Sequence, residues 1–169
     1  MKEVIVKDTQ LAEAAEKDFD AFIDVVVQAI YASIGGELNA DTMAELNADQ
    51  VTLLAYIILR DEVMEGGFIQ LIHDGYGAFI FKNPFSRMMR NWGINGLASM
   101  LNKVHKSYSH HHETIEADLT DDEFMALYEQ FPEFDDYDDD FVENEEEWTN
   151  AVAYYLDEHL DQFVTIVNE

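Results

Sequence analysis

The sequence has no cysteine and only two prolines among its 169 residues. Without cysteine the chain can form no disulfide, no thiolate nucleophile and no cysteine-ligated zinc site. It also has no apolar run that approaches the roughly 18 residues of a membrane-spanning helix. The longest such run, Leu53–Leu59, has the length of a buried core segment. We therefore expect a cytoplasmic protein that does not bind membranes.

Basic residues are scarce as well. Nine Lys and Arg residues stand against 36 Asp and Glu, which gives a formal net charge of −27. A field of this sign repels phosphates, so we expect no direct binding of nucleic acid or of an anionic membrane. Apolar residues still make up 48% of the chain, which indicates a folded protein and not an acidic disordered tail. The partners that the charge favours are basic proteins.

Motifs for catalysis are missing too. The sequence contains no Gly-x-Ser-x-Gly, no glycine-rich phosphate-binding loop and no His-Glu-x-x-His. The many carboxylates look alike and exposed, whereas acid–base catalysis needs environments that separate the pKa values of a pair. We therefore expect a protein that is not an enzyme and has no cofactor.

The apolar spacing predicts an all-α protein, a single compact domain over residues 1–169 with six to eight helices. Thr120 with Glu123 forms a capping box, and Pro132 ends the helix that follows. Gly35-Gly36 and Gly66-Gly67 are expected to end helices. Helices are expected over residues 8–34, 49–64, 94–108 and 120–131, and from a start between 140 and 147 to about 167.

The charge is distributed unevenly along the chain. Residues 60–106 carry four acids and six bases, whereas residues 107–169 carry 21 acids and no base. Halophilic adaptation would spread acids over the whole surface, and so many like charges in one third of a fold repel one another. The acidic third is therefore predicted to be a binding surface. The residues expected to bind the partner are Asp135, Asp136, Asp138, Asp139, Asp140, Glu143, Glu145, Glu146 and Glu147, with Asp118, Asp121, Asp122 and Glu123 as a second group.

Two patterns in and next to the acidic third are compatible with metal binding. Asp136, Asp138, Asp140 and Glu147 have the spacing of a calcium loop, but Phe141 stands where such a loop needs glycine. His105 and Glu113, two helical turns apart, could bracket a metal, whereas the adjacent His110–His112 would point in different directions on a helix and make a poor single site. Neither pattern is specific enough to predict a metal site.

A basic segment interrupts the acidic chain. It could bind nucleic acid by charge and base stacking, or pair with the acidic third within one chain or across a dimer. The overall negative field disfavours nucleic acid. The residues of this segment are Phe81, Lys82, Phe85, Arg87, Met88, Met89, Arg90 and Trp92.

One segment resembles a known family. The residues Glu62, Gly66, Gly67, Phe68 and Gln70 match the E-x-x-x-G-G-F-x-Q signature of a family of small helical bacterial proteins that includes a nineteen-kilodalton DNA mimic. Chain length, acidity and the segments around Tyr128 and from Trp148 to Phe163 agree, so the resemblance covers roughly residues 50–165. From the residues alone, the double glycine is a helix break with Phe68 packed inside.

The resemblance implies an all-helical, usually dimeric protein whose carboxylates imitate the phosphates of duplex DNA. It implies a DNA-binding protein as partner, such as a helix-turn-helix transcription factor, whose DNA binding is blocked. A nucleoid protein is a further candidate partner that the acidic charge favours. Carboxylates on two helices and a loop could approach the charge density of DNA, about one charge per 1.7 Å of axis. An immunity or antitoxin protein against a basic toxin such as a nuclease would use the same surface. A metal-binding module or an acidic domain without such a partner also stays open.

Overall fold

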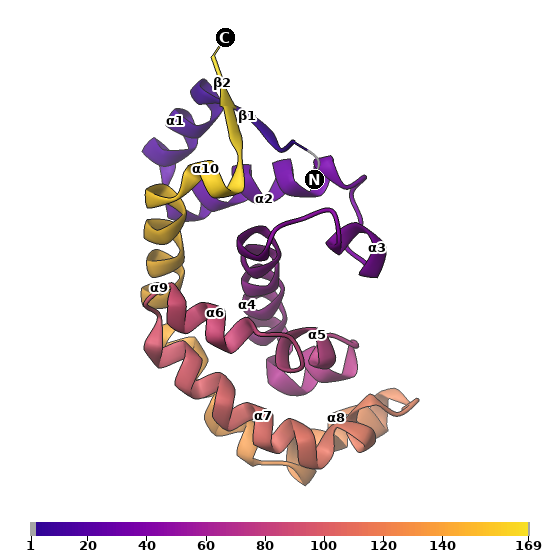
Figure 1. The fold of residues 1–169 in the computed structure, drawn as a ribbon. Helices are drawn as coiled ribbons and strands as arrows, with labels where there is room; N and C mark the ends of the chain where they lie inside the picture. The colour runs from indigo at the N-terminus through magenta and orange to yellow at the C-terminus, as the bar shows by residue number, and fades with distance from the viewer. Residues whose placement is uncertain (1–2, 169) are drawn as a thin grey trace. The chain divides into compact units, whose positions relative to one another are not determined.

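The computed structural model describes residues 3–168, which form ten helices and two short strands (Figure 1). The predicted all-α class is confirmed. The helices outnumber the predicted six to eight because α3 (Ala40–Met43), α5 (Gly77–Phe81) and α10 (Leu160–Phe163) are too short for apolar spacing to reveal. None of the helices within these residues is long and apolar enough to cross a membrane.

The chain divides into two compact units. Unit 1 comprises the residues up to Leu54 together with those from Thr149 onward, and unit 2 comprises Ala55–Trp148. Two long helices, α4 (Ala48–His73) and α9 (Glu133–Glu158), contribute to both units. The single domain expected over residues 1–169 stays a prediction.

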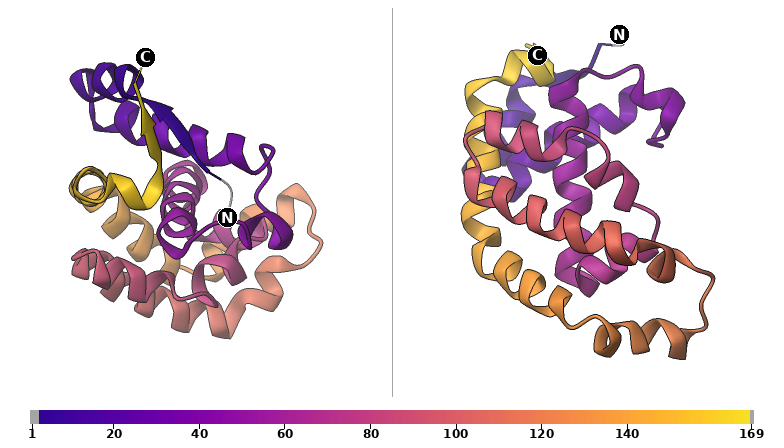
Figure 2. Two further views of the ribbon diagram at one scale, coloured as in Figure 1. Left: turned by 45° about the horizontal axis from the view of Figure 1, so that its top comes forward. Right: turned by 60° about the horizontal axis from the view of Figure 1, so that its bottom comes forward.

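Unit 1 contains the two strands. β1 (Ile5–Lys7) pairs in parallel with β2 (Thr165–Val167), with Ile5 opposite Thr165, and the two lie side by side in Figures 1 and 2. The predicted final helix to about residue 167 is therefore wrong at its end, since α9 stops at Glu158. The β-branched residues 165–167 suit an extended strand, and β1, far away in the sequence, supplies their hydrogen-bond partners.

The predicted helix over residues 8–34 is in fact two helices, α1 (Asp8–Lys17) and α2 (Phe19–Ser33). Asp18 between them is extended, and its carboxylate accepts a hydrogen bond from the Ala21 amide at 2.7 Å. Aspartate is a strong helix N-cap and a poor interior residue, which explains the break. The end of α2 at Gly35-Gly36 is confirmed, with both glycines at positive φ.

Unit 2 is built from the remainder of α4 together with α5, α6 (Phe85–Asn91), α7 (Asn95–Glu116), α8 (Asp121–Gln130) and the first part of α9. The apolar middle of α4 is buried as predicted, and Leu59 has no exposed surface. The helix α7 runs alongside α9 (Figure 2), where the Ser107 hydroxyl contacts Glu133 and Tyr137. These contacts hold the acidic helix to the core of the unit.

The whole acidic run is helical, so the predicted helix start between residues 140 and 147 is wrong, and so is the expectation that part of these carboxylates stand on a loop. The helix α9 begins at Glu133, and acids in its first turn favour this start because they lie near the positive end of the helix dipole. Phe134 and Phe141 are fully buried, and Trp148 is nearly so. Their spacing of seven residues places them on one side of the helix and leaves the other side to the carboxylates.

Candidate protein-binding surface

The outer side of α9 in unit 2 is a continuous row of carboxylates. Seven of the nine acids predicted in this run are exposed, and within residues 3–168 none of these seven side chains forms an ion pair or hydrogen bond. The row, called the α9 stripe below, consists of Asp135, Asp136, Asp139, Asp140, Glu143, Glu146 and Glu147. The structure therefore brings together most of the first predicted group on one regular element.

The spacing of the α9 stripe can be compared with that of DNA. A helix rises about 1.5 Å per residue, so residues 135–147 extend over about 18 Å, with successive carboxylates on average roughly 3 Å apart along the axis. Duplex DNA carries one phosphate charge per about 1.7 Å of axis, and each strand one per about 3.4 Å. The stripe is thus denser in charge than one DNA strand and sparser than a duplex.

Asp138 differs from its neighbours because it faces the interior of unit 2. Its Oδ1 accepts a hydrogen bond of 2.8 Å from the Phe68 amide. Phe68 is the first residue after a break in α4 at Gly67, where φ is 77° and ψ is −176°. The Asp138 carboxylate therefore caps the second part of α4, and its role is structural. The other half-buried acid of the run, Glu145, also lies outside the stripe.

The remaining signature residues meet at the same break. The Gly66 carbonyl accepts a hydrogen bond of 2.6 Å from the Tyr128 hydroxyl of α8, and Gln70 donates to Glu62 at 2.8 Å. A break in a helix leaves a carbonyl and an amide without their usual partners. Here α8 satisfies the carbonyl and α9 the amide. Phe68 is fully buried, so the predicted helix break with Phe68 inside is confirmed.

Burial around this break raises the pKa values of three side chains. Desolvation raises the pKa of Asp138 to about 6, and the Phe68 amide opposes the shift only in part. Desolvation and then a hydrogen bond with Asp74 raise the pKa of Glu62 to about 7. Burial, followed by the charges of Asp138, Asp74 and Asp135, raises the pKa of Tyr128 to about 12. The Tyr128 hydroxyl is thus kept protonated, as donation to Gly66 requires.

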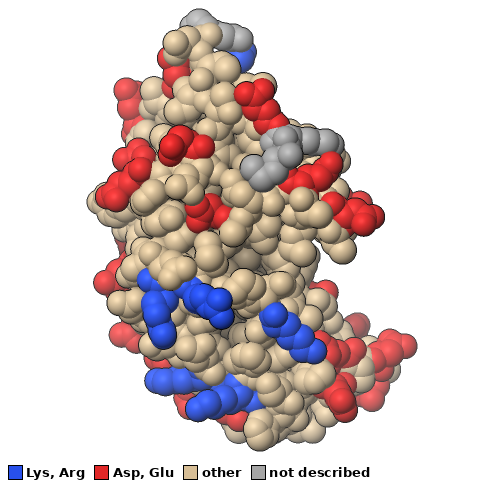
Figure 3. All heavy atoms as spheres, in the orientation of Figure 1, with Lys and Arg blue, Asp and Glu red and all other residues tan. Residues whose placement is uncertain are grey.

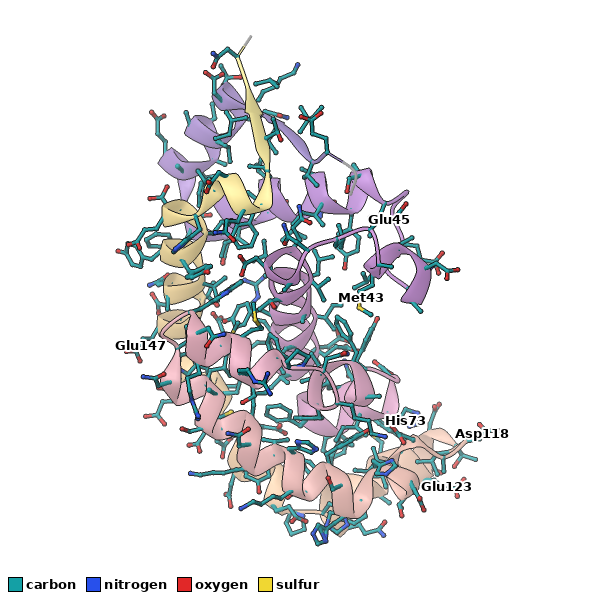
Figure 4. The ribbon with its side chains drawn as sticks, in the orientation of Figure 1. Met43, Glu45, His73, Asp118, Glu123 and Glu147 are labelled. Carbon is teal, nitrogen blue, oxygen red and sulfur yellow. The ribbon has the colours of Figure 1, made fainter. Side chains whose placement is uncertain are left out.

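The second predicted group lies at the start of α8. Thr120 and Glu123 form the predicted capping box, in which the Thr120 amide donates to Glu123 at 3.1 Å. This hydrogen bond with Thr120 lowers the pKa of Glu123 and gives its carboxylate a structural role. Asp118, Asp121 and Asp122 are exposed. Asp118 and Glu123 lie at one end of unit 2 and Glu147 lies well away from them (Figure 4).

Further acids belong to unit 2 and were not predicted as site residues. Glu113 and Glu129 are exposed, and Glu133 binds His111 at 3.2 Å in addition to Ser107. They stand outside the dense run of residues 135–147, so local charge density gave no signal for them. Their exposure on α7, α8 and α9 enlarges the negative field of the unit.

A calcium loop over residues 136–147 is not formed, because these residues are helical. Residues two apart on a helix point in nearly opposite directions, so inward Asp138 and outward Asp140 cannot share one ion. The histidines also diverge, with His111 directed at Glu133 and His112 at Glu116. Within residues 3–168 no group of three or more His, Asp or Glu is placed to hold a metal.

The basic segment forms an exposed patch on unit 2 (Figure 3). Phe81, Phe85 and Trp92 are buried and cannot stack on bases. None of the five basic side chains makes an ion pair with any residue from 3 to 168, so pairing with the acidic third within the chain is not found. The five side chains of this basic patch are Lys82, Arg87 and Arg90 of the basic segment, joined by Lys103 and Lys106 of α7.

The geometry defines a small, acidic, all-helical protein with a row of carboxylates on a rigid helix. A family model described as "DMP19-like protein" matches residues 44–159. The chain is 33% identical over 153 residues to the DNA mimic protein DMP19 of Neisseria meningitidis serogroup B (strain ATCC BAA-335 / MC58), a match that covers 89% of this chain and 92% of that protein. The chain belongs to the DMP19-like protein family.

Proposed function

We propose that this protein is a DNA mimic that binds the DNA-binding surface of a basic protein and blocks its binding to DNA. The partner is a transcription factor or a nucleoid protein, the interaction takes place in the cytoplasm, and no catalysis or cofactor is involved. The observation that carries the proposal is the α9 stripe, seven exposed and unpaired carboxylates on one helix. The relative from Neisseria, a DNA mimic by name, supports it.

The stripe is suited to this task because it is preorganised. Phe134 and Phe141 anchor α9 in the core, and Asp138 ties it to the break in α4. A basic surface that binds these carboxylates therefore needs to order little of the mimic, which lowers the entropic penalty of association. The concentrated negative charge also steers a basic partner toward the stripe and raises the association rate.

The contact residues that we propose are those of the α9 stripe, joined by Asp118, Asp121 and Asp122. Asp138 and Glu123 are left out because their carboxylates cap helices of the protein itself. Glu145 is left out as well, because it is half-buried and lies outside the stripe. The stripe alone falls short of duplex charge density, and Asp121 and Asp122 of α8 with Asp118 just before it add to the negative surface.

We also propose that the protein acts as a homodimer. The basic patch carries five positive charges with no partner among residues 3–168, while 36 acids on each chain leave many carboxylates unpaired. In a dimer the patch of each copy would lie against acidic groups of the other.

The proposal is tested by affinity capture from a lysate of the source organism at low salt. The α9 variant carries Asp139→Asn, Asp140→Asn, Glu143→Gln and Glu146→Gln. We expect the wild-type protein to retain a DNA-binding protein that duplex DNA releases from the column, and the α9 variant to lose it.

A matched control removes the same charge from unit 1. The unit 1 control carries Glu3→Gln, Glu13→Gln, Glu16→Gln and Glu37→Gln, all at exposed positions. It is expected to retain the partner. Equal retention by the α9 variant and the control would contradict the proposal, and capture of a nuclease toxin would favour the immunity function in its place.

A further inference from the structure

A groove in unit 1 combines aromatic and acidic side chains. It lies where the junction of α1 and α2 approaches the C-terminal part of α9 (Figures 1 and 2) and has a volume of about 160 Å³. Pockets for small organic ligands usually hold about 300–1,000 Å³, so this groove has room for a single side chain. Its lining residues are Ala15, Asp18, Phe19, Phe22, Ala153, Tyr154 and Asp157.

The aromatic part of the groove is unusually open. Phe22 and Ala153 are buried, whereas Phe19 is 40% and Tyr154 58% exposed. The rings of Phe19 and Tyr154 meet edge to face, with centroids 5.4 Å apart. Exposed aromatic faces attract cations, and more strongly where water is partly excluded.

The charged part has one sign. Asp18 and Asp157 are exposed, and no basic residue is among the lining residues. The Asp18 carboxylate caps α2, which fixes its position, while Asp157 has no hydrogen bond or ion pair within residues 3–168. Unit 1 as a whole carries 15 acids and three bases. Charge and shape thus both favour a cationic side chain.

We infer that this groove binds an arginine side chain of a protein partner. A guanidinium can stack on the ring of Tyr154 or Phe19 and donate to the Asp157 carboxylate at the same time. Arginine fits better than lysine because its planar group is weakly hydrated and stacks on aromatic rings. The inference rests on the proposed function in one respect, namely that the arginine belongs to a basic protein partner. The groove would anchor that partner on unit 1, separately from the α9 stripe.

The test is an NMR titration of the full chain with the peptide acetyl-Gly-Arg-Gly-amide. We expect saturable shifts of the ring signals of Phe19 and Tyr154. The same peptide with neutral citrulline should give no saturable shift, and the lysine peptide should bind more weakly. Tyr154→Ala and the nearly isosteric Asp157→Asn should each weaken arginine binding about two- to fivefold.

Two variants separate this inference from the proposed function. The α9 variant should bind the peptide like the wild type, even though it loses the protein partner. Tyr76→Ala, at an exposed aromatic residue of unit 2, should also leave peptide binding unchanged. Chemical shift changes spread evenly over the acidic surface would overturn the inference. So would binding of the citrulline or lysine peptide as tight as that of the arginine peptide. Either result would leave the proposed function untouched.

Discussion

At the scale of single residues, the contact between Gly67 and Asp138 links the most distinctive motif of the sequence to its acidic helix. The conformation of Gly67 lies in a region that is open almost only to glycine. A Cβ at this position would also meet the Asp138 carboxylate. Glycine is therefore required twice, for the backbone conformation and for the close approach of α9.

The first prediction concerns this glycine. Gly67→Ala should lower the free energy of unfolding by about 3 kcal/mol or more, because it combines backbone strain with the clash against Asp138. Gly75→Ala is the control, since Gly75 also has a positive φ but nothing within 4 Å of an added Cβ. It should lower stability by only about 1–2 kcal/mol. Urea unfolding measures both, and equal losses would contradict the role of Asp138.

The second prediction concerns pH. Asp138 has a pKa of about 6 in the folded protein against an ordinary value of 3.8, so the folded state holds the proton more tightly. The stability that this proton contributes is present below about pH 4 and is lost as pH rises through about 6. Asp138→Asn keeps an oxygen for the Phe68 amide and has no charge. Its stability relative to wild type should rise by roughly 1–2 kcal/mol between pH 4 and pH 8, with partial solvent exposure allowed for.

The control for this pH dependence is Asp139→Asn. It removes the same charge from an exposed neighbour on the stripe. We expect its unfolding free energy to follow the wild-type pH curve more closely. If Asp138→Asn and Asp139→Asn gave parallel curves, the pH effect would belong to general charge repulsion and not to the buried carboxylate.

At the scale of elements, α9 carries two chemistries on two sides. Aromatic residues fix one side in the core, and the other side repeats carboxylates at spacings of three and four residues. Like charges at these spacings destabilise an isolated helix by about 0.2–0.5 kcal/mol per pair. The helix is therefore held by its packing against this repulsion.

The third prediction follows from this repulsion. The melting temperature of the wild type should rise with sodium chloride, because salt screens the exposed carboxylates. The α9 variant should melt higher than the wild type at low salt and respond less to added salt. The unit 1 control has lost the same number of charges outside the stripe, so its melting temperature should still rise with salt as that of the wild type does. If the melting temperature of the control responded to salt as little as that of the α9 variant, the repulsion would not be concentrated in α9.

The fate of individual elements shows which features a sequence can predict. The capping box at Thr120 and the stop before Pro132 are local signals, and both are confirmed. The spacing of Phe134, Phe141 and Trp148 is also consistent with a helix that starts near Glu133. The start was nevertheless predicted too late, because acids at most other positions hide this apolar spacing. The strand β2 could not be predicted, because its partner β1 lies about 160 residues away.

The same distinction holds for the candidate site. The exposure of the α9 stripe follows from helical periodicity once the run is known to be helical. The inward turn of Asp138 could not be predicted, because its partner Phe68 lies 70 residues earlier in the chain. The function of the stripe itself stays a prediction.

At the scale of the whole molecule, the outstanding feature is that the α9 stripe and the basic patch form no ion pairs within residues 3–168. The fourth prediction uses the basic patch. Arg87→Glu together with Arg90→Glu should turn a dimer into a monomer in sedimentation velocity, because both residues would then repel the acids of a second copy. Lys17→Glu, at an exposed residue of unit 1, should leave the dimer intact. A dimer that survives the double substitution would contradict this role of the patch.

The most direct test of the central claim is competition for the captured DNA-binding protein. A labelled duplex bound to that protein is titrated with the wild type, the α9 variant and the unit 1 control, and fluorescence anisotropy is followed at several salt concentrations. The account predicts that the wild type and the control displace the duplex, with a potency that falls steeply as salt rises, and that the α9 variant does not. Displacement by the α9 variant at wild-type concentrations, or binding that leaves the duplex in place, would contradict it.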